Sequence, residues 1–255
     1  FRGLWVYKRV QSTYGNVRIL RPYSAWDIPI TRRDPGPDGT AGNADDGGLV
    51  TFWDFDPKYK GAAYEPTSPV NRDSAHDDVY NGFELTMTKR QSRGWMALGS
   101  FQMIKNHIWT GLSATPSSPN DEFFPLDETW DWSGKMMGSY RAPYDVTVSG
   151  IYNLLAGVPR QRTYTFRNVP NATSVTLPLE ALGDSRDPAQ HVVNMRAMKP
   201  IRLSGAKKLA LSFEIFNMFN VNTATTVRYV SSSTYGAISA ILPPRVARVG
   251  AEFTF

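Results

Sequence analysis

The feature that most restricts the fold of this chain is an alternation of apolar and polar residues that recurs in separate segments. From Leu209 to Ile215, every second residue is Leu, Phe or Ile, and the residues between them are Ala, Ser and Glu. Successive side chains of a β-strand point to opposite faces, so this period of two is typical of a strand with one apolar face. The segments 83–88, 193–203 and 245–255 alternate in the same way, and no segment of comparable length has a stripe of helical period. The sequence therefore predicts an all-β protein.

The connections between the predicted strands are alternately short and long. The short ones, 91–94, 142–145 and 204–207, contain the Gly, Pro, Ser or Asp residues that tight turns favour. The long ones are polar, and long structureless loops are unusual in a compact soluble domain. Short turns at one end and long loops at the other are instead typical of an outer-membrane β-barrel. The long connections are 10–79, 106–131, 157–191 and 221–244.

These patterns predict an antiparallel transmembrane β-barrel portion with short periplasmic turns and long extracellular loops. Each strand has about ten residues, which is the length that a tilted strand needs to cross a bilayer. If the chain ends at the periplasmic face, the strand directions alternate without conflict. The segment 10–79 is then one large extracellular loop, with a short strand of its own at 51–55. The predicted membrane strands are 2–9, 80–90, 95–105, 132–142, 145–156, 192–203, 208–220 and 245–255.

Charge and composition exclude several other classes of protein. The net charge of +5 comes from dispersed Lys and Arg residues, without a basic run or a nucleic-acid motif, so no nucleic-acid partner is expected. The absence of cysteine excludes a disulfide framework, an iron–sulfur site and a thiol nucleophile. No window approaches the roughly 18 consecutive apolar residues of a membrane helix. The chain opens at Phe1 without a Met or a signal peptide, which indicates a mature chain, a processed product or a fragment.

Aromatic residues gather near the ends of the predicted strands. Such residues form the interfacial girdles of a membrane barrel, although the core of an ordinary β-sandwich would also contain them. A β-sandwich would not need the alternation of short and long connections, so we expect girdles. The aromatic residues concerned are Trp5, Tyr7, Trp95, Trp109, Trp130, Trp132, Tyr140, Tyr144 and Phe219.

Five segments carry a resemblance to a known family. They are Tyr80–Arg90 with the following Gly94–Trp95, Gly138–Tyr144, Ser149–Tyr152, Leu211–Asn220 and Pro244–Phe255. Together they resemble the C-terminal barrel region of TonB-dependent outer-membrane receptors, especially the Oar-like type with a carboxypeptidase regulatory domain. The two C-terminal segments in combination are the most specific. The terminal Phe255, with Ala251 and Phe253 at alternate positions before it, is also similar to the signal that the barrel-assembly machinery reads.

The resemblance implies a membrane-transport function in the bacterial outer membrane. Receptors of this family have a barrel of about 22 strands with a plug domain inside it. They bind a scarce ligand at their extracellular loops and import it with energy delivered by TonB. With 255 residues and no recognisable plug domain, the chain resembles the last third of such a barrel. Its implied partners are outer-membrane lipid, the barrel-assembly machinery, and the missing strands and plug of the receptor or another chain.

Two other functions fit the same pattern of strands. An isolated arc of eight strands would leave two unpaired edges in lipid, so the strands could instead close on themselves as a small barrel, serving as an adhesin or a structural surface protein. An outer-membrane enzyme is the second alternative, because a Ser/His/Asp set need not be sequential. No nucleophile elbow, P-loop or dinucleotide fingerprint is present, and no catalytic or cofactor-binding residue stands out. We therefore expect a transport protein and not an enzyme.

An acidic, glycine-rich segment at 34–48 is a candidate calcium site. It contains Asp34, Asp38, Asp45 and Asp46 among five glycines. Oxygen ligands on a tight loop suit Ca²⁺, although the spacing lacks the position-12 Glu of an EF-hand. The alternative is a solvated, turn-rich loop without a metal.

The other charged groups are expected to be structural. One set shares the polar side of adjacent predicted strands, where its members would form ion pairs in the barrel lumen or contact a plug or a ligand. This set is Arg196, Arg202, Glu214, Arg248 and Glu252. The three histidines fall in predicted loops without metal-ligand spacing, and an acidic cluster around the first of them is expected at the surface. These residues are His76, His107 and His191, with Asp73, Asp77 and Asp78.

Deletion of Phe255 is expected to impair assembly into the outer membrane, because it removes the aromatic end of the C-terminal signal. The measurement is the amount of folded protein in outer-membrane fractions. Normal assembly of the truncated chain would count against the signal.

Overall fold

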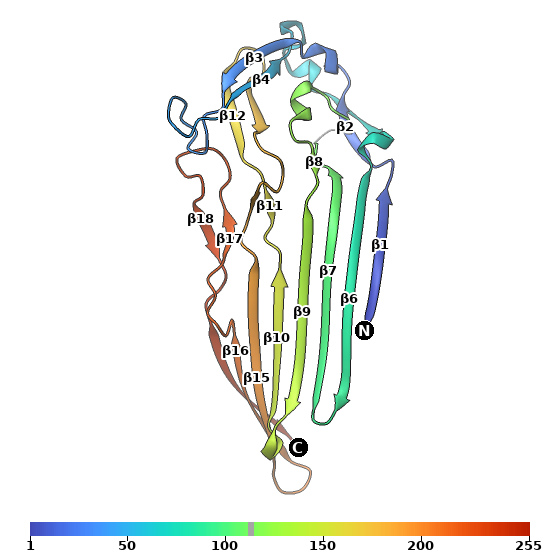
Figure 1. Ribbon diagram of the computed structural model, residues 1–255, viewed down its shortest axis with the longest axis vertical. Coiled ribbons are helices and arrows are strands. Elements are labelled where there is room, and N and C mark those ends of the chain that lie inside the picture. Colours follow the sequence, from blue (N-terminus) through green and yellow to red (C-terminus); the bar gives the residue numbers. More distant parts are fainter. Residues whose placement is uncertain (112–114) are drawn as a thin grey trace.

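The computed structural model describes residues 1–111 and 115–255, and its main feature is one antiparallel sheet of long strands (Figure 1). The order of the strands is β1-β6-β7-β9-β10-β15-β16-β19, and the short β8 (Leu126–Asp127) pairs with the end of β7. The prediction of an all-β, antiparallel fold is therefore confirmed. The long strands are β1 (Arg2–Val10), β6 (Asp78–Ser92), β7 (Trp95–Trp109), β9 (Trp130–Arg141), β10 (Thr147–Leu155), β15 (Gln190–Arg202), β16 (Lys208–Phe216) and β19 (Val246–Thr254).

The two largest differences from the predicted strand boundaries are four residues each: β7 continues to Trp109, and β16 ends early. The predicted strand 208–220 stops at Phe216, because Asn217 adopts a φ of 50°, in the left-handed region that Asn tolerates better than most residues. The buried side chain of Asn217 donates from Nδ2 to the carbonyl oxygens of Val221 and Pro243, each at 2.8 Å. These bonds turn the chain out of the sheet and join both ends of the following loop.

The short turns lie at one end of the sheet and the long connections at the other (Figure 1). Between β6 and β7, Arg93 and Gly94 have φ values of 52° and 84°. Two successive positive φ values are typical of a two-residue hairpin loop whose twist matches the strands. Between β9 and β10, Tyr144 and Asp145 also have positive φ values, 62° and 60°, so β10 begins two residues later than predicted.

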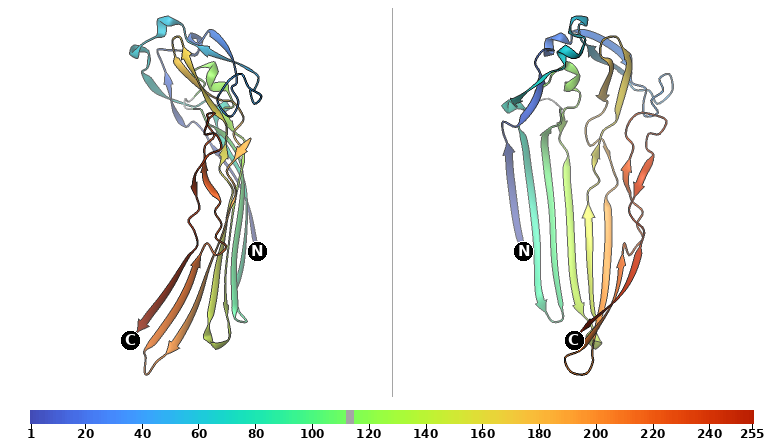
Figure 2. Two further views of the ribbon diagram at one scale, coloured as in Figure 1. Left: turned by 90° about the vertical axis from the view of Figure 1, so that its left-hand side faces the viewer. Right: turned by 180° about the vertical axis from the view of Figure 1, so that it is seen from behind.

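The sheet is curved and open. Within the described residues, β1 pairs only with β6 and β19 pairs only with β16, so the two ends of the sheet do not meet. Figure 2 shows the β15, β16 and β19 end bending away from the β6 and β7 end. The described part of the chain therefore forms a curved antiparallel sheet and not a closed barrel, and the prediction of a portion of a transmembrane barrel stays a prediction.

The long connections are not structureless, contrary to their prediction as polar loops. Apart from residues 112–114, which lie outside the described residues, they fold into short strands and 3-10 turns at one end of the sheet. We call this region the loop cap; it comprises 11–77, 110–111, 115–129, 156–189 and 217–245. The short strand predicted at 51–55 is present as β4. The strand pairs of the cap are β2 (Tyr14–Arg18) with β5 (Thr67–Asn71), β3 (Ile28–Arg33) with β4 (Leu49–Asp54), β11 (Pro159–Arg160) with β14 (Ser185–Arg186), β12 (Thr163–Val169) with β13 (Thr173–Pro178), and β17 (Ala224–Val227) with β18 (Ile238–Ile241).

The helical segments of the described residues are all 3-10 turns, and none has the length or hydropathy of a membrane-spanning helix. They are η1 (Tyr23–Ala25), η2 (Pro57–Tyr59), η3 (Ala62–Tyr64), η4 (Ser74–His76), η5 (Pro119–Glu122) and η6 (Pro143–Asp145). All but η6 belong to the cap.

The hydrophobic core lies in the loop cap and not on the long sheet. Phe52 of β4 and Leu177 of β13 are both 0% exposed, and the ring of Phe52 stacks on Phe166 of β12 with centroids 4.7 Å apart. Val169 and Val175 complete this buried cluster. The core therefore forms where the β3–β4 pair packs against the β12–β13 pair, which joins two connections that are far apart in the sequence.

Replacement of Leu177 by Ala is expected to destabilise the cap by about 3 kcal/mol, because it leaves a cavity among fully buried side chains. The change in free energy of unfolding can be followed by hydrogen exchange of cap peptides. Leu49→Ala is the matched control, since Leu49 is 72% exposed and its loss is expected to cost little. Equal effects of the two substitutions would contradict the placement of the core.

Candidate functional site

The register of the long sheet places apolar side chains from all of its long strands on one face. In β16, for example, Phe213 lies between Ala197 of β15 and Val249 of β19. Across β1, β6 and β7, the same face carries a row of Trp5, Phe83 and Met103. We call this the apolar face. Its other residues include Leu85, Met87, Ala97, Phe101, Trp132, Met136, Tyr140, Val148, Tyr152, Leu154, Val193, Met195, Leu209, Leu211, Ile215, Ala247, Ala251 and Phe253.

No second layer of the described chain covers the apolar face. Val249 is 79% exposed, and Phe213 and Trp5 are also exposed. Charged side chains on this face stay near the strand ends, where Lys105 neighbours Trp130 and Lys89 neighbours Ala97. Soluble monomeric proteins rarely leave an apolar surface of this extent exposed. A surface of this kind usually contacts another protein or a membrane.

Several of the aromatic residues expected near strand ends lie there in rows on the apolar face, whereas Tyr144 lies in the η6 turn and Phe219 in the loop cap. Trp130 pairs with Lys105 at the cap end, and Tyr140 pairs with Trp95 at the turn end. Trp130 and Tyr140 are ten positions apart in β9, which is about 34 Å along the strand and about 26 Å along the normal of a bilayer at a tilt of roughly 40°. This span matches the apolar band of about 25 Å in outer-membrane barrels.

Trp109 does not belong to these rows, although its position near a strand end suggested that it would. It is only 5% exposed, and its ring meets the ring of His76 edge-on, with centroids 4.4 Å apart. The prediction was wrong because β7 extends beyond the predicted strand end and carries Trp109 into the cap.

The opposite face of the sheet is predominantly polar, although it also carries apolar side chains such as Leu98 and Met137, and an ion-paired cluster crosses three of its strands. Glu214 of β16 lies between Arg196 of β15 and Arg248 of β19, and its carboxylate pairs with both guanidinium groups. The Arg248 Nε donates to Glu214 at 2.6 Å. Ion pairing was predicted for this set, and it is present for three of its five members. Arg202 and Glu252 lie on the same face without an ion pair among the described residues.

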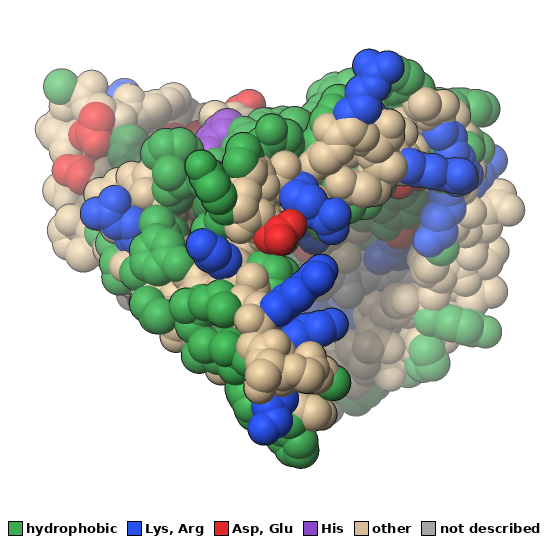
Figure 3. Space-filling view, turned by 90° about the horizontal axis from the view of Figure 1, so that it is seen from below, with side chains coloured by type: hydrophobic (Ala, Val, Ile, Leu, Met, Phe, Trp, Pro, Cys, Tyr) green, Lys and Arg blue, Asp and Glu red, His purple; other side chains and the backbone are tan. Residues whose placement is uncertain are grey.

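The two faces differ in shape as well as in chemistry. Figure 3, which looks at the turn end, shows Lys and Arg side chains along the hollowed side of the molecule and hydrophobic side chains gathered on the other side. The sheet therefore presents different side chains on its two sides.

The acidic segment 34–48 is tied into the cap by one buried ion pair. Arg162 donates from Nη1 and Nη2 to the two carboxylate oxygens of Asp34, at 2.8 and 2.6 Å. Its Nη1 also donates to the Ser231 hydroxyl at 3.1 Å. The hydrogen bond from Arg162 holds the pKa of Asp34 below its usual range, against the opposing effect of burial, and the Gly36 N–H lowers it further. One guanidinium thus joins three long connections of the chain.

The other carboxylates of this segment bond mostly within the loop. Asp38 accepts from the Thr40 N–H at 2.7 Å, and Asp46 accepts from the Gly42 N–H at 2.8 Å. The second oxygen of Asp46 is buried without a hydrogen-bond partner among the described residues, which suits a cation ligand. However, Asp34 faces Arg162, and no group of three or more acidic or histidine side chains in the described chain is arranged to hold a metal ion. Calcium binding therefore stays a prediction.

The histidines are separated, and each has its own partner. His76 bonds to Asp73 at 2.5 Å, and His191 bonds to the Tyr152 hydroxyl at 2.8 Å. His107 pairs with Glu128. His107 and His191 lie at the cap ends of β7 and β15 and not in loops as predicted.

The acidic residues near His76 are also paired, and not all of them lie at the surface as expected. Asp77 is buried and pairs with Arg9 at 2.8 Å, and Asp78 pairs with Arg72 at 3.2 Å. Both pairs form where β1 and β6 enter the cap.

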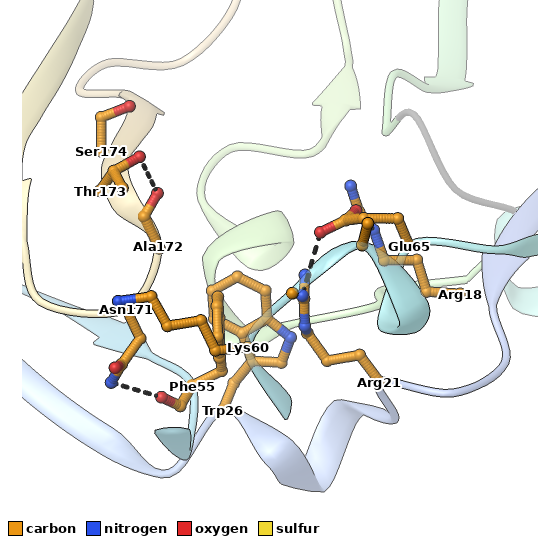
Figure 4. Close-up of a pocket in the computed structure, with 12 residues that line it drawn as sticks. Arg18, Arg21, Trp26, Phe55, Lys60, Glu65, Asn171, Ala172, Thr173 and Ser174 are labelled. Carbon is orange, nitrogen blue, oxygen red and sulfur yellow. Dashed lines mark hydrogen bonds and ion pairs between the residues drawn. The ribbon is translucent and has the colours of Figure 1, made fainter. Parts of the chain in front are cut away.

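A pocket of about 380 Å³ opens between two connections of the cap (Figure 4). Sequence reasoning missed it, because its lining comes from segments that only the tertiary fold brings together. Those segments are 18–26, 55–65 and 171–174, and the side chains that give the pocket its character are Arg18, Arg21, Trp26, Phe55, Lys60, Glu65 and Asn171.

No protein-family model, curated protein or solved structure matches this chain.

Stability of the cap is expected to fall in acid through Asp34. The pKa of Asp34 is lower in the folded protein than in the unfolded chain, where it is about 3.9. Ionised Asp34 therefore contributes to the free energy of unfolding above the unfolded-state pKa. This contribution is lost as the pH falls through the folded-state pKa. Asp34→Asn should remove about 3 kcal/mol at neutral pH, since it leaves Arg162 buried without a counter-charge, and should flatten the acid dependence.

The measurement is the hydrogen-exchange protection of peptides covering 34–48 and 160–166 between pH 3 and 7. Asp38→Asn is the matched control, because Asp38 bonds only within the loop. An unchanged acid profile in Asp34→Asn would contradict the role of the ion pair.

Proposed function

We propose that this chain forms part of the wall and the extracellular loops of an outer-membrane β-barrel of the TonB-dependent receptor type. The observation that carries the proposal is the register, which aligns the alternating residues of all the long strands into one apolar face and one predominantly polar face. The apolar face suits lipid, and the polar face suits a hydrated or plugged lumen.

The ends of the sheet support the same assignment. The turns contain few residues, as periplasmic turns do, and the connections at the other end fold into a cap, as extracellular loops do. The aromatic rows near both ends would lie at the two membrane interfaces. In this orientation the pocket of the cap faces the outside of the cell, where a receptor meets its ligand.

The two edge strands require partners if the sheet lies in lipid. An unpaired backbone N–H or C=O group in the hydrocarbon region costs several kcal/mol, and β1 and β19 each present a row of them. We propose that these edges pair with further strands of the receptor barrel or with another chain, and that a plug contacts the polar face. Arg196, Glu214 and Arg248 would then line the lumen, and no catalytic role is proposed for them.

The alternative, a small self-closed barrel, needs β1 to pair with β19. In the described residues these strands are the two opposite edges of an open sheet. The open arrangement therefore favours the larger barrel.

Cysteine labelling of outer membranes tests the proposal, and the chain has no cysteine of its own to interfere. At Ser212 on the polar face, an introduced cysteine is expected to react with a membrane-impermeant maleimide. At Leu211 on the apolar face, it is expected to react only after denaturation, because lipid excludes the reagent. Equal labelling of Ser212→Cys and Leu211→Cys in intact membranes would contradict a sheet that spans the bilayer.

A disulfide scan separates the larger barrel from the self-closed one. Trp5→Cys in β1 is combined in turn with Val249→Cys and Ala251→Cys in β19, all of them on the apolar face. No intramolecular disulfide is expected for the receptor wall, whereas efficient oxidation would support a closed eight-stranded barrel.

A further inference from the structure

The pocket of the loop cap carries an excess of positive charge. Arg18, Arg21 and Lys60 line it, and Glu65 is the only acidic residue of its lining within the described chain. The Asp54 carboxylate lies behind the wall, but it is fully buried and accepts hydrogen bonds from the N–H groups of Phe55, Asn171 and Ala172. The lining itself therefore has three cations against one carboxylate.

Two of the cations already hold a carboxylate within the protein. Arg18 donates from Nε to Glu65 at 3.0 Å, and Arg21 approaches the other oxygen of Glu65 at 3.0 Å. Burial would raise the pKa of Glu65, but its hydrogen bonds with Arg21 and Arg18 hold that pKa below its usual range. Glu65 is therefore ionised at neutral pH, and the pocket already binds one carboxylate of its own chain.

Arg21 is held in a fixed position. Its guanidinium lies over the ring of Phe55, 4.1 Å from the centroid, and it donates to the Tyr59 carbonyl at 2.9 Å. Trp26 packs edge-on against the same Phe55 ring, with centroids 5.2 Å apart. The charged and aromatic walls of the pocket are thus arranged before any ligand arrives, which reduces the entropy lost on binding.

Lys60 and Trp26 keep binding capacity that the described chain does not use. Lys60 Nζ contacts only a neutral acceptor, the Pro170 carbonyl at 3.1 Å, and has no carboxylate partner within residues 1–111 and 115–255. The indole N–H of Trp26 has no acceptor in the same residues, and the side chain is half-buried in the wall (Figure 4). A cation and a ring with a free donor together suit a ligand that has an anionic group and a planar or apolar part.

We propose that this pocket binds a small organic carboxylate, with Lys60 at the carboxylate group and Trp26 against the remainder of the molecule. The volume of about 380 Å³ lies near the lower end of small-molecule sites and suits a compact ligand. The inference deepens the proposed function and rests on it, since it names the class of ligand that the extracellular loops would capture.

Ligand binding would also link two connections of the cap. Its walls belong to the connections 10–79 and 157–191, which are otherwise joined by the core and by Arg162. Lys60 and Trp26 belong to the first of these connections and Asn171 to the second, so a ligand that fills the pocket contacts both.

Calorimetric titration of the folded chain in detergent micelles, or of the longer protein if the chain is part of one, tests the inference. The probes are benzoate and its neutral isostere benzamide. Benzoate is expected to bind at least about tenfold more tightly, because only it offers a charge-assisted contact to Lys60. Lys60→Gln should weaken benzoate binding by roughly tenfold and leave benzamide unchanged.

Lys58→Gln is the matched control. Lys58 is an exposed lysine two positions away, paired with Asp56 and outside the pocket lining, so its loss should not change benzoate binding. Trp26→Phe keeps an aromatic wall but removes the N–H donor. It should weaken the binding of benzoate and of benzamide by similar factors, each smaller than the loss of benzoate binding in Lys60→Gln. Circular dichroism of each variant confirms that it is folded.

Three results would overturn the inference: no benzoate binding by the folded chain, equal binding of benzoate and benzamide, or equal losses in Lys60→Gln and Lys58→Gln. None of them bears on the membrane sheet, which the labelling of Leu211→Cys and Ser212→Cys tests independently. Conversely, benzoate binding together with failed labelling would retain the pocket and remove the receptor assignment.

Discussion

The backbone ladder of the antiparallel sheet is the constraint on which the rest of the structure depends. Each pairing aligns one residue with one partner, and the observed register places the apolar positions of neighbouring strands on one face. A slip by one residue would move Phe213 to the face of Glu214 and put charges among the apolar side chains. The same register brings Arg196 and Arg248 to Glu214. A single geometric rule therefore produces both faces, and the proposed membrane function follows from their difference.

The loop cap is stabilised by different interactions from those of the long sheet. The long sheet has one layer and gains no core from the described chain, whereas the cap packs Phe52 and Phe166 into a dry cluster. The buried Arg162 adds directional bonds to Asp34 and Ser231 that a hydrophobic cluster alone would not supply. Such buried ion pairs act mainly through their geometry, because desolvation offsets much of their attraction. The core and the ion pair together bring the segments of the pocket to one place.

Much of the sheet could be predicted from the sequence, and little of the cap could. The alternation from Leu209 to Ile215 is a local signal, because strand faces repeat every two residues regardless of what the strand pairs with. The burial of Trp109, by contrast, depends on His76 and on the length of β7, neither of which a local pattern contains. The sequence marks Asp34 as a candidate calcium ligand. Its partner Arg162 is 128 positions away, and no local sequence pattern around Arg162 indicates the ion pair.

The sequence by itself determined the all-β class, the positions of the long strands and the face on which each of their residues lies. Tertiary structure alone decided that the sheet stays open in the described chain, that the loops form a cap with the hydrophobic core, and that Lys60, Trp26 and Arg21 share a pocket. The reason is the range of the interactions. A strand's faces follow from the geometry of adjacent residues, whereas edges, cores and pockets depend on contacts between segments that the chain brings together only when it folds.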